Sequence, residues 1–575
     1  MKKHKKLISC MALIILLCQN TICPVSAQTT TTLPSAYMND LDKLIDTYPK
    51  TKCQTYNTCW AYSAIGLAEF DLIRDGLYDK NLDLSELQLA YFTYHHVTDP
   101  LGGTVGDWTG FRSGHNYLEA GGHLFFSARA LMQWKGVAME SDLPCSQAQT
   151  SHPIDQAYAY DKTIAHLQNV YLLDIHKEPQ AVKQMIMEHG AVGIGIYFVQ
   201  SIDDLTRFVK TVPYHGTQAE TYYCNDPARR ANHAVNIVGW DDDFPAENFA
   251  SQPEGNGAWL IRNSWSEKTG FSKESYCWIS YYDTSIDDEA WAYDFESADN
   301  YDYNYQYDGG ICCADAYRLS TSANVFTVHA AANELLEAVS VSLTCYTNVP
   351  YTIRVYTDLI TADDPRSGQL AATVEGKTTS KGIYTIPLKN AVTLAKGSKF
   401  SVVVELGIPD AGVDVEICSF KTYIPIQCKV FMNPKQSYCL YKGKWLDLYE
   451  QYSAYRKTGN LCIKAYTSEL GGDTVSPVKQ LKKKSAGKHD ITLSWGKVSG
   501  ANGYEIYRST SKNGTYQKIK TITSASKTSY KDTKLSKNKN YYYRIRAYKN
   551  QSTDGGTKNK TVGLLSSAVK VKTAK

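Results

Sequence analysis

The sequence lacks several features that would fix a function at once. No two cysteines are spaced as CxxC, which argues against a zinc ribbon and against a thioredoxin-type redox site. After the first 27 residues no apolar stretch is long enough to cross a bilayer, and the tail ending in Lys570-Val571-Lys572 lacks a hydrophobic sorting segment. With 21% charged and 43% hydrophobic residues, the composition is not that of a disordered chain. We therefore expect globular domains without a membrane span, a cofactor or a metal.

The first residues have the pattern of a secretory signal. A basic start precedes an apolar run from Leu7 to Cys18, and Val25-Ser26-Ala27 supplies a small-residue cleavage site. The pattern predicts a signal peptide over residues 1–27. We expect a secreted, extracellular protein, associated with the cell wall, if at all, without a covalent anchor.

The ends of the chain differ in charge. Residues 476–575 hold 23 Lys and Arg against 4 Asp and Glu, a net charge of +19, whereas the whole chain carries only +3. This uneven distribution of charge along the chain predicts separate roles for separate domains. One hypothesis is that the basic end holds the protein on cell-wall polyanions through many weak, salt-screened contacts. The alternative hypothesis is that the basic end is only a soluble spacer whose lysines bind nothing specific.

A chain of 575 residues is too long for one hydrophobic core, and its pattern changes along its length. The early part favours helices first and strands later, which predicts an α+β domain, and the rest shows short alternating strands between turn residues, which predicts β-sandwiches. The predicted boundaries are 28–298 for the α+β domain, 299–468 for a first β domain, 469–476 for a linker and 477–575 for a second β module. The predicted helices are 59–74, 84–95 and 125–134, and the clearest predicted strands are 191–198, 234–240, 258–263, 351–356, 399–405, 491–495, 503–508 and 541–548.

One cysteine has the surroundings that a nucleophile needs. Cys59 begins a predicted helix after Thr58, a residue type that caps helices, so the helix dipole and a nearby imidazolium should lower the pKa of its thiol. His233 opens an apolar strand and can serve as the base. Asn263 would hold the other ring nitrogen, and Trp265 would shield that hydrogen bond from water. A lone cysteine is usually a small hydrophobe, so the argument depends on the three residues together.

These residues lie in motifs that resemble the papain-like cysteine peptidases, in the same chain order. The motifs are Gln54 with Thr58-Cys59-Trp60, Asn232-His233-Ala234-Val235 with Gly239-Trp240, and Asn263-Ser264-Trp265. The resemblance implies a two-lobed peptidase fold and hydrolysis of peptide bonds in protein or peptide substrates through a thiolate acyl-enzyme. It also implies that Gln54 binds the oxyanion, that Gly121 and Gly122 bind the substrate backbone, and that His123, Leu124 and Ala234 line a substrate pocket.

The later parts of the chain resemble other families. Tyr305-Gln306-Tyr307-Asp308 and Asn324-Val325-Phe326 resemble the lectin-like domain that bacterial papain-like peptidases carry after the peptidase. Trp495 and the strand from Gly503 to Tyr507 resemble a fibronectin type III module. These resemblances imply glycans or cell-wall polymers as partners of the C-terminal β domains, and no nucleic acid.

The sequence departs from the peptidase pattern at the oxyanion-hole glutamine. The family places it six residues before the nucleophile, where this chain has Cys53, and Gln54 lies five before. Either the intervening loop is one residue shorter, which we favour, or the donor is lost. Only six residues separate Ala27 from Pro34, where the resemblance begins, too few for the usual inhibitory pro-segment. The alternative to an active endopeptidase is therefore a cell-surface adhesin on a degenerate, weakly active peptidase scaffold.

Overall fold

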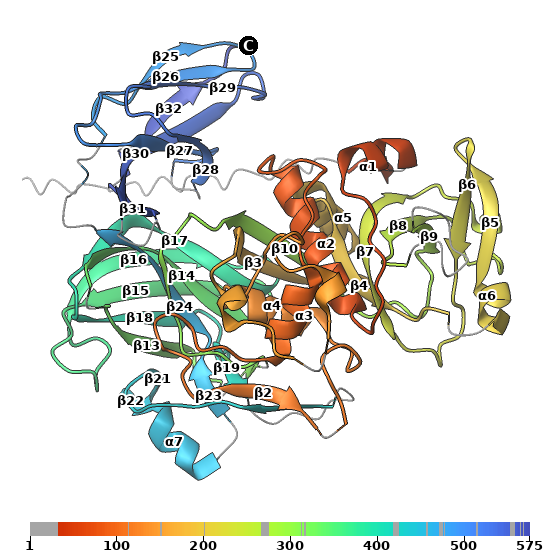
Figure 1. Ribbon diagram of the computed structural model, residues 1–575, viewed down its shortest axis with the longest axis horizontal. Coiled ribbons are helices and arrows are strands. Elements are labelled where there is room, and N and C mark those ends of the chain that lie inside the picture. Colours follow the sequence, from red (N-terminus) through yellow and green to blue (C-terminus); the bar gives the residue numbers. More distant parts are fainter. Residues whose placement is uncertain are drawn as a thin grey trace, which may run out of the picture. The chain divides into compact units, whose positions relative to one another are not determined.

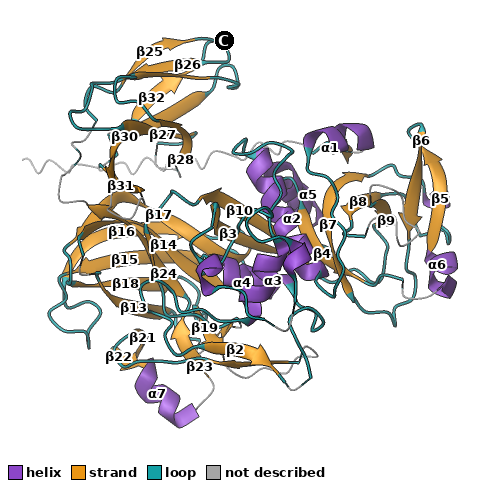
Figure 2. Cartoon of the chain, in the orientation of Figure 1, coloured by secondary structure: helices purple, strands orange, loops and turns teal. Residues whose placement is uncertain are grey.

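The computed structural model is shown in Figures 1 and 2. It describes residues 33–575 except 39, 113, 150–151, 200–201, 266–274, 312, 316–317, 330, 418–424, 456–457, 471–474, 476–477, 513–515, 553–557, 564 and 567. The predicted signal peptide and most of the predicted linker lie outside the described residues. None of the helices in the described part is both long and apolar enough to cross a membrane.

The N-terminal domain combines helices and strands, as the sequence predicted. Its helices are α1 (Leu41–Thr47), α2 (Cys59–Arg74), α3 (Glu86–Tyr94), α4 (Leu124–Met132), α5 (Pro179–His189) and α6 (Ile202–Phe208). Its strands are β1 (Ala36–Tyr37), β2 (Trp108–Phe111), β3 (Ala165–Asp174), β4 (Val192–Ile196), β5 (Val209–Tyr214), β6 (Thr217–Tyr222), β7 (His233–Asp241), β8 (Ala258–Arg262), β9 (Tyr276–Ser280) and β10 (Glu289–Ser297). Helix α2 is buried along most of its length and packs against β7, β10 and α4.

The middle domain is a β-sandwich with one helix. Its elements are β11 (Tyr303–Tyr305), β12 (Cys313–Asp315), β13 (Thr321–Thr327), β14 (Asn333–Leu343), β15 (Pro350–Thr357), β16 (Gln369–Lys377), β17 (Lys381–Leu394), β18 (Lys399–Leu406), β19 (Asp414–Ile417), β20 (Ile426–Lys429), β21 (Ser437–Tyr441), β22 (Lys444–Asp447), α7 (Leu448–Tyr455), β23 (Thr458–Leu461) and β24 (Ile463–Leu470). One sheet has the order β16-β15-β18-β13-β21-β22. Buried aliphatic and aromatic side chains such as Val339, Val402 and Phe400 fill the core.

The N-terminal and middle domains share one sheet. Its strand order is β11-β24-β14-β17-β3-β10-β4-β7-β8-β9-β6-β5, so the sheet passes from the middle domain into the N-terminal domain at the β17–β3 pair. In this pair Gly382 lies opposite Tyr171, and a Cβ on Gly382 would lie 1.9 Å from the carbonyl oxygen of Val170. A second pair, β2 with β20, also joins the two domains. The boundary predicted near residue 299 lies in a turn between β10 and β11, and the domains on its two sides share a continuous sheet.

A buried ion-pair network adds to this junction. Arg129 of α4 contacts Asp308 at 3.0 Å between Nη1 and Oδ2, and Lys464 of β24 contacts the other oxygen of Asp308 at 2.6 Å. All three side chains are almost fully buried. Because each buried charge has an opposite partner, loss of one would leave another uncompensated.

The C-terminal module consists of two small sheets. Its strands are β25 (Lys482–Ala486), β26 (Ile491–Ser494), β27 (Gly503–Ser509), β28 (Gln517–Ile522), β29 (Ser529–Asp532), β30 (Asn540–Ser552), β31 (Lys558–Val562) and β32 (Val569–Lys572). The sheets have the orders β25-β26-β29 and β28-β27-β30-β31, with β32 also on β30. Trp495, Tyr504 and Ile545 belong to the core between them. The lysines of β25 are exposed, whereas Arg546 is buried and contacts Glu337 of β14 at 2.8 Å.

Candidate active site

Cys59 is the first residue of α2, and its side chain is half-buried. Thr58 is the N-cap residue, as the sequence predicted, and its side chain makes no capping hydrogen bond. The helix is held at this end by Trp60, which is 1% exposed. The thiol therefore lies at the helix N-terminus beside a fixed aromatic anchor.

His233 is the first residue of β7 and pairs with Ile196 of β4. Its Nε2 lies 2.7 Å from Oδ1 of Asn263, which directly follows β8. The backbone N–H of Ser264 also donates to this oxygen, at 2.7 Å, so the oxygen is an acceptor. Nε2 therefore carries the proton, and Nδ1 of the neutral ring is the acceptor that remains for the Cys59 thiol.

Two aromatic rings cover the histidine. Trp265 lies with its ring centroid 4.4 Å from that of His233, and Phe198 lies 5.6 Å away. Phe198 and Trp265 also contact each other edge to face at 5.0 Å. The predicted shielding by Trp265 agrees with this geometry. Phe198 was not recognised from the sequence, because nothing in its own segment distinguishes it from a core residue.

Burial shifts the pKa values of Cys59 and His233 in directions that disfavour a thiolate–imidazolium ion pair. It raises the pKa of the Cys59 thiol, although backbone hydrogen bonds with Ala234 and Trp60 act in the opposite direction. It lowers the pKa of His233 to about 4, and the bond to Asn263 offsets only part of this. The sequence had predicted a lowered thiol pKa, but a neutral imidazole supplies no positive charge to lower it. Transfer of one proton from Sγ to Nδ1 would create both charges together, so that each stabilises the other.

Gln54 is held from both sides. Its Oε1 accepts a hydrogen bond of 2.6 Å from the Ser264 hydroxyl, and its Nε2 donates to the carbonyl of Tyr56 at 2.8 Å. The backbone N–H of Gln54 also donates to the carbonyl of Ser264 at 2.9 Å. An amide nitrogen has two hydrogens, so one remains for a substrate. Cys53, by contrast, is exposed.

Ser264 is a site residue that sequence reasoning did not assign a role. It connects the Asn263 segment to the Gln54 loop through its hydroxyl and its carbonyl. The only available signal was its position between Asn263 and Trp265.

The predicted substrate-binding residues lie on adjoining elements. Gly121 has φ +73°, and its carbonyl accepts a hydrogen bond from Tyr94 at 2.7 Å. A Cβ on Gly122 would lie 2.3 Å from the Trp60 ring, so only glycine allows this close approach. His123 caps α4 by accepting from the backbone N–H of Phe125. The remaining two predicted residues differ in exposure: Leu124 is buried and Ala234 is half-buried.

Comparisons with known proteins identify two of the domains. The family model described as papain family cysteine protease matches residues 47–299.

Residues 47–299 form a papain family cysteine protease domain.

A lectin-like domain model matches residues 304–467, which identifies the middle domain. Among solved structures, the clostridial cysteine protease Cwp84 after propeptide cleavage is 24% identical, with a TM-score of 0.60, over 76% of this chain and all of that one. The cysteine protease and lectin-like domains of Cwp84, a surface-layer-associated protein of Clostridium difficile, are 25% identical, with the same TM-score, over 76% of this chain and 89% of that one. No curated protein matches the chain. The chain is thus a cysteine-type peptidase with a lectin-like domain.

Proposed function

We propose that the protein is a secreted endopeptidase that cleaves peptide bonds through a thioester acyl-enzyme. The observation that carries the proposal is the hydrogen bond from His233 to Asn263, which leaves Nδ1 as the acceptor for the thiol proton. That arrangement gives a base of fixed tautomer beside a cysteine at a helix N-terminus.

The proposed reaction has two halves. In the first, His233 takes the proton of Cys59, the sulfur attacks the carbonyl carbon, and the oxyanion accepts hydrogen bonds from the Cys59 backbone N–H and from Gln54. His233 then gives the proton to the departing amine, which leaves a thioester on Cys59. In the second half His233 takes a proton from water, and the resulting hydroxide attacks the thioester carbonyl. The C–S bond then breaks, the acyl group leaves as a carboxylic acid, and His233 returns the proton to the sulfur of Cys59.

The test is labelling with a mechanism-based epoxide, followed by peptide mapping and a peptidase assay. We expect one label, on Cys59, and loss of both labelling and cleavage in Cys59→Ala. Cys53→Ala is the matched control because it removes an exposed thiol from the neighbouring loop. Folded protein that is neither labelled nor able to cleave would favour the adhesin alternative instead.

We also propose that the lectin-like domain binds cell-wall glycans outside the cell. Two large aromatic side chains at the junction of the lectin-like and peptidase domains support this proposal: Phe431, just after β20 of the lectin-like domain, is 45% exposed, and Trp108, on β2 of the peptidase domain, is 48% exposed. The partner strands β2 and β20 bring their segments together, and exposed aromatic rings provide apolar faces on which sugars can stack. Binding of the Cys59→Ala protein to purified wall polysaccharide should weaken with Trp108→Ala. It should not weaken with Tyr282→Ala, which removes an exposed aromatic residue that follows β9 and does not belong to the β2–β20 pair.

Charge suggests a second means of retention at the wall. The exposed lysines of β25 support the hypothesis that the basic module binds polyanions. We would compare the full-length protein with a chain ending at Gly472 for retention on cell walls at low and high salt. Equal retention of both, or retention that ignores salt, would eliminate the electrostatic contribution.

A further inference from the structure

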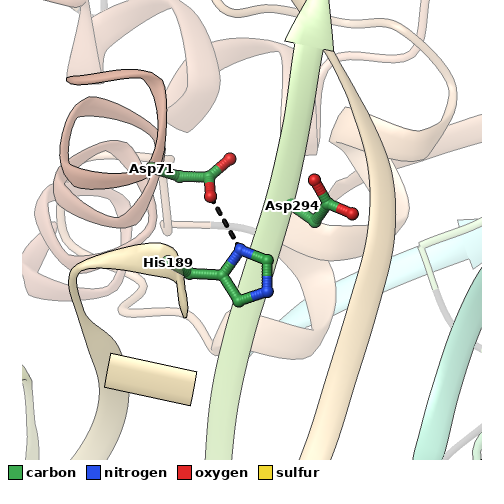
Figure 3. A group of neighbouring side chains, drawn as sticks. All are labelled: Asp71, His189 and Asp294. Atoms are coloured by element: carbon green, nitrogen blue, oxygen red, sulfur yellow. Dashed lines mark hydrogen bonds and ion pairs between the residues drawn. The ribbon is translucent and has the colours of Figure 1, made fainter. Parts of the chain in front are cut away.

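A second cluster of potential ligand residues lies at the far end of α2 from the nucleophile. Asp71 comes from α2, His189 is the last residue of α5, and Asp294 lies in β10 (Figure 3). Each offers one ligand atom, and these atoms lie within 4.8 Å of one another. Nδ1 of His189 lies 2.7 Å from Oδ1 of Asp71.

The two carboxylates are oriented by partners outside the cluster. The backbone N–H of Phe295 donates to Oδ2 of Asp71 at 2.6 Å, and the side-chain amide of Asn169 donates to Oδ2 of Asp294 at 2.7 Å. The register of β10 against β3 shifts between Asp294 and Phe295, so both of these consecutive residues contribute to the cluster. Outer partners that hold one oxygen of a carboxylate and leave the other available are typical of metal sites.

We propose that Asp71, His189 and Asp294 bind a divalent transition-metal cation of the zinc type. Two carboxylates and one imidazole form a donor set that suits zinc, with water completing a tetrahedron. The ion would replace the proton shared by His189 and Asp71, and its two positive charges would balance the two carboxylates. Calcium fits less well because it prefers oxygen ligands only.

Another group with similar ligand types does not support a metal site. Glu86, Glu140 and Cys145 also bring potential ligand atoms together. However, the Lys52 ammonium lies 2.8 Å from Oε1 of Glu86. The protein's own lysine thus already supplies the positive charge that a metal ion would bring to this group. Within the part of the chain that the structure describes, the hydrogen bonds and ion pairs of the Asp71 cluster involve no lysine.

The position of the site indicates a structural role. Asp71 follows Cys59 by twelve residues in the same helix, which is about 18 Å at 1.5 Å per residue. The ion would join α2, α5 and β10, and α2 carries the nucleophile. The inference does not depend on the proposed peptidase mechanism, because no ligand belongs to the candidate active site.

The test uses full-length protein carrying Cys59→Ala, which prevents self-digestion. After treatment with chelator and dialysis, we would measure zinc stoichiometry and the thermal unfolding temperature as zinc is added. We expect Asp294→Asn and His189→Gln each to lose one bound zinc or to weaken it at least about tenfold. Asp288→Asn is the matched control, because its carboxylate is exposed just before β10.

A zinc-dependent rise in unfolding temperature should occur in the parent and in Asp288→Asn and should be missing from the two ligand variants. Cobalt in place of zinc should give d–d absorption without a thiolate charge-transfer band, which separates this site from any that uses a cysteine. Circular dichroism of the metal-free proteins verifies that each variant is folded. Equal stoichiometry and equal stabilisation in the parent and both ligand variants, or no zinc binding by the parent, would overturn the proposal.

Discussion

The hydrogen bond between His233 and Asn263 determines which nitrogen of the ring can act as a base. Its length of 2.7 Å, and the burial of both residues, fix the ring with Nδ1 unprotonated. In the proposed mechanism the two residues are therefore unequal, since His233 moves the proton and Asn263 only positions the ring.

Because the two proposed roles differ, substitutions of His233 and Asn263 should lower activity by different amounts. His233→Ala should lower kcat/KM by about a thousandfold or more, because Cys59 loses its proton acceptor. Asn263→Ala should leave a weaker but measurable enzyme. Steady-state hydrolysis of a peptide substrate measures both. Wild-type rates in His233→Ala would mean that the base has been misassigned.

Gln54 and Cys53 form a second comparison. Gln54→Ala should lower kcat about a hundredfold, with little change in stability, because its amide acts on charge present mainly in the transition state. Cys53→Ala should be mild, since its side chain is exposed. Kinetics and urea unfolding of the two variants provide the check, and the reverse order would show that Cys53 occupies the place of the family glutamine.

Residue types and their order were enough to predict that His233 and Asn263 lie together, which the structure shows, and that Cys59 begins a helix. Their catalytic roles stay predictions. The raised pKa of Cys59 and the lowered pKa of His233 were not predictable, because each comes from the burial of that side chain in the folded protein. Ser264 and Phe198 were missed for a related reason. Their roles arise from contacts with residues far away in the sequence.

At the scale of elements, local pattern placed the ends of the predicted helices and strands to within a few residues, whereas other elements, such as α5 and β3, were not predicted. Helix α2 follows its apolar periodicity, and β7 and β8 follow their apolar runs. The β17–β3 pair was not predictable, because strand pairing between segments two hundred residues apart leaves no local signal.

Substitution of Gly382 tests how much the β17–β3 pair contributes to the stability of the protein. Gly382→Ala should destabilise the protein by about 1–3 kcal/mol, because the added Cβ would overlap the carbonyl of Val170. Gly397→Ala is a matched control: Gly397 also has a positive φ, but a Cβ there would meet nothing within 4 Å. Urea unfolding of both variants in the Cys59→Ala background measures the difference. Equal losses would mean that backbone strain alone, and not the junction, accounts for the effect.

At the scale of the whole molecule, buried titratable groups link stability to pH. His166 stacks on Trp134 at 3.8 Å and bonds to Asn300 at 2.9 Å, and Asp299 lies near enough to raise its pKa. Burial nevertheless lowers the pKa of His166 to about 4, from 6.5. The unfolded chain therefore binds the proton more readily, so stability is lost as pH falls from about 6.5 to about 4.

Buried carboxyl groups such as Glu296, whose pKa burial raises to about 7, act in the opposite direction over part of this range. The contribution of His166 can be separated by comparing the parent with a variant that lacks the imidazole. His166→Asn should lose less stability than the parent between about pH 6.5 and 4, as followed by thermal unfolding at several pH values. Parallel curves for the two proteins would show that His166 titrates normally in the folded state.

The sheet shared by the peptidase and lectin-like domains also has a consequence for a truncated protein that lacks the lectin-like domain. Strand β3 pairs with β10 on one side and with β17 on the other. A peptidase domain ending at residue 298 would expose β3 as an edge strand, with unpaired backbone groups beside apolar Val170 and Leu172. Such an edge is a template for association with another chain. The lectin-like domain therefore protects the peptidase domain from association through this edge.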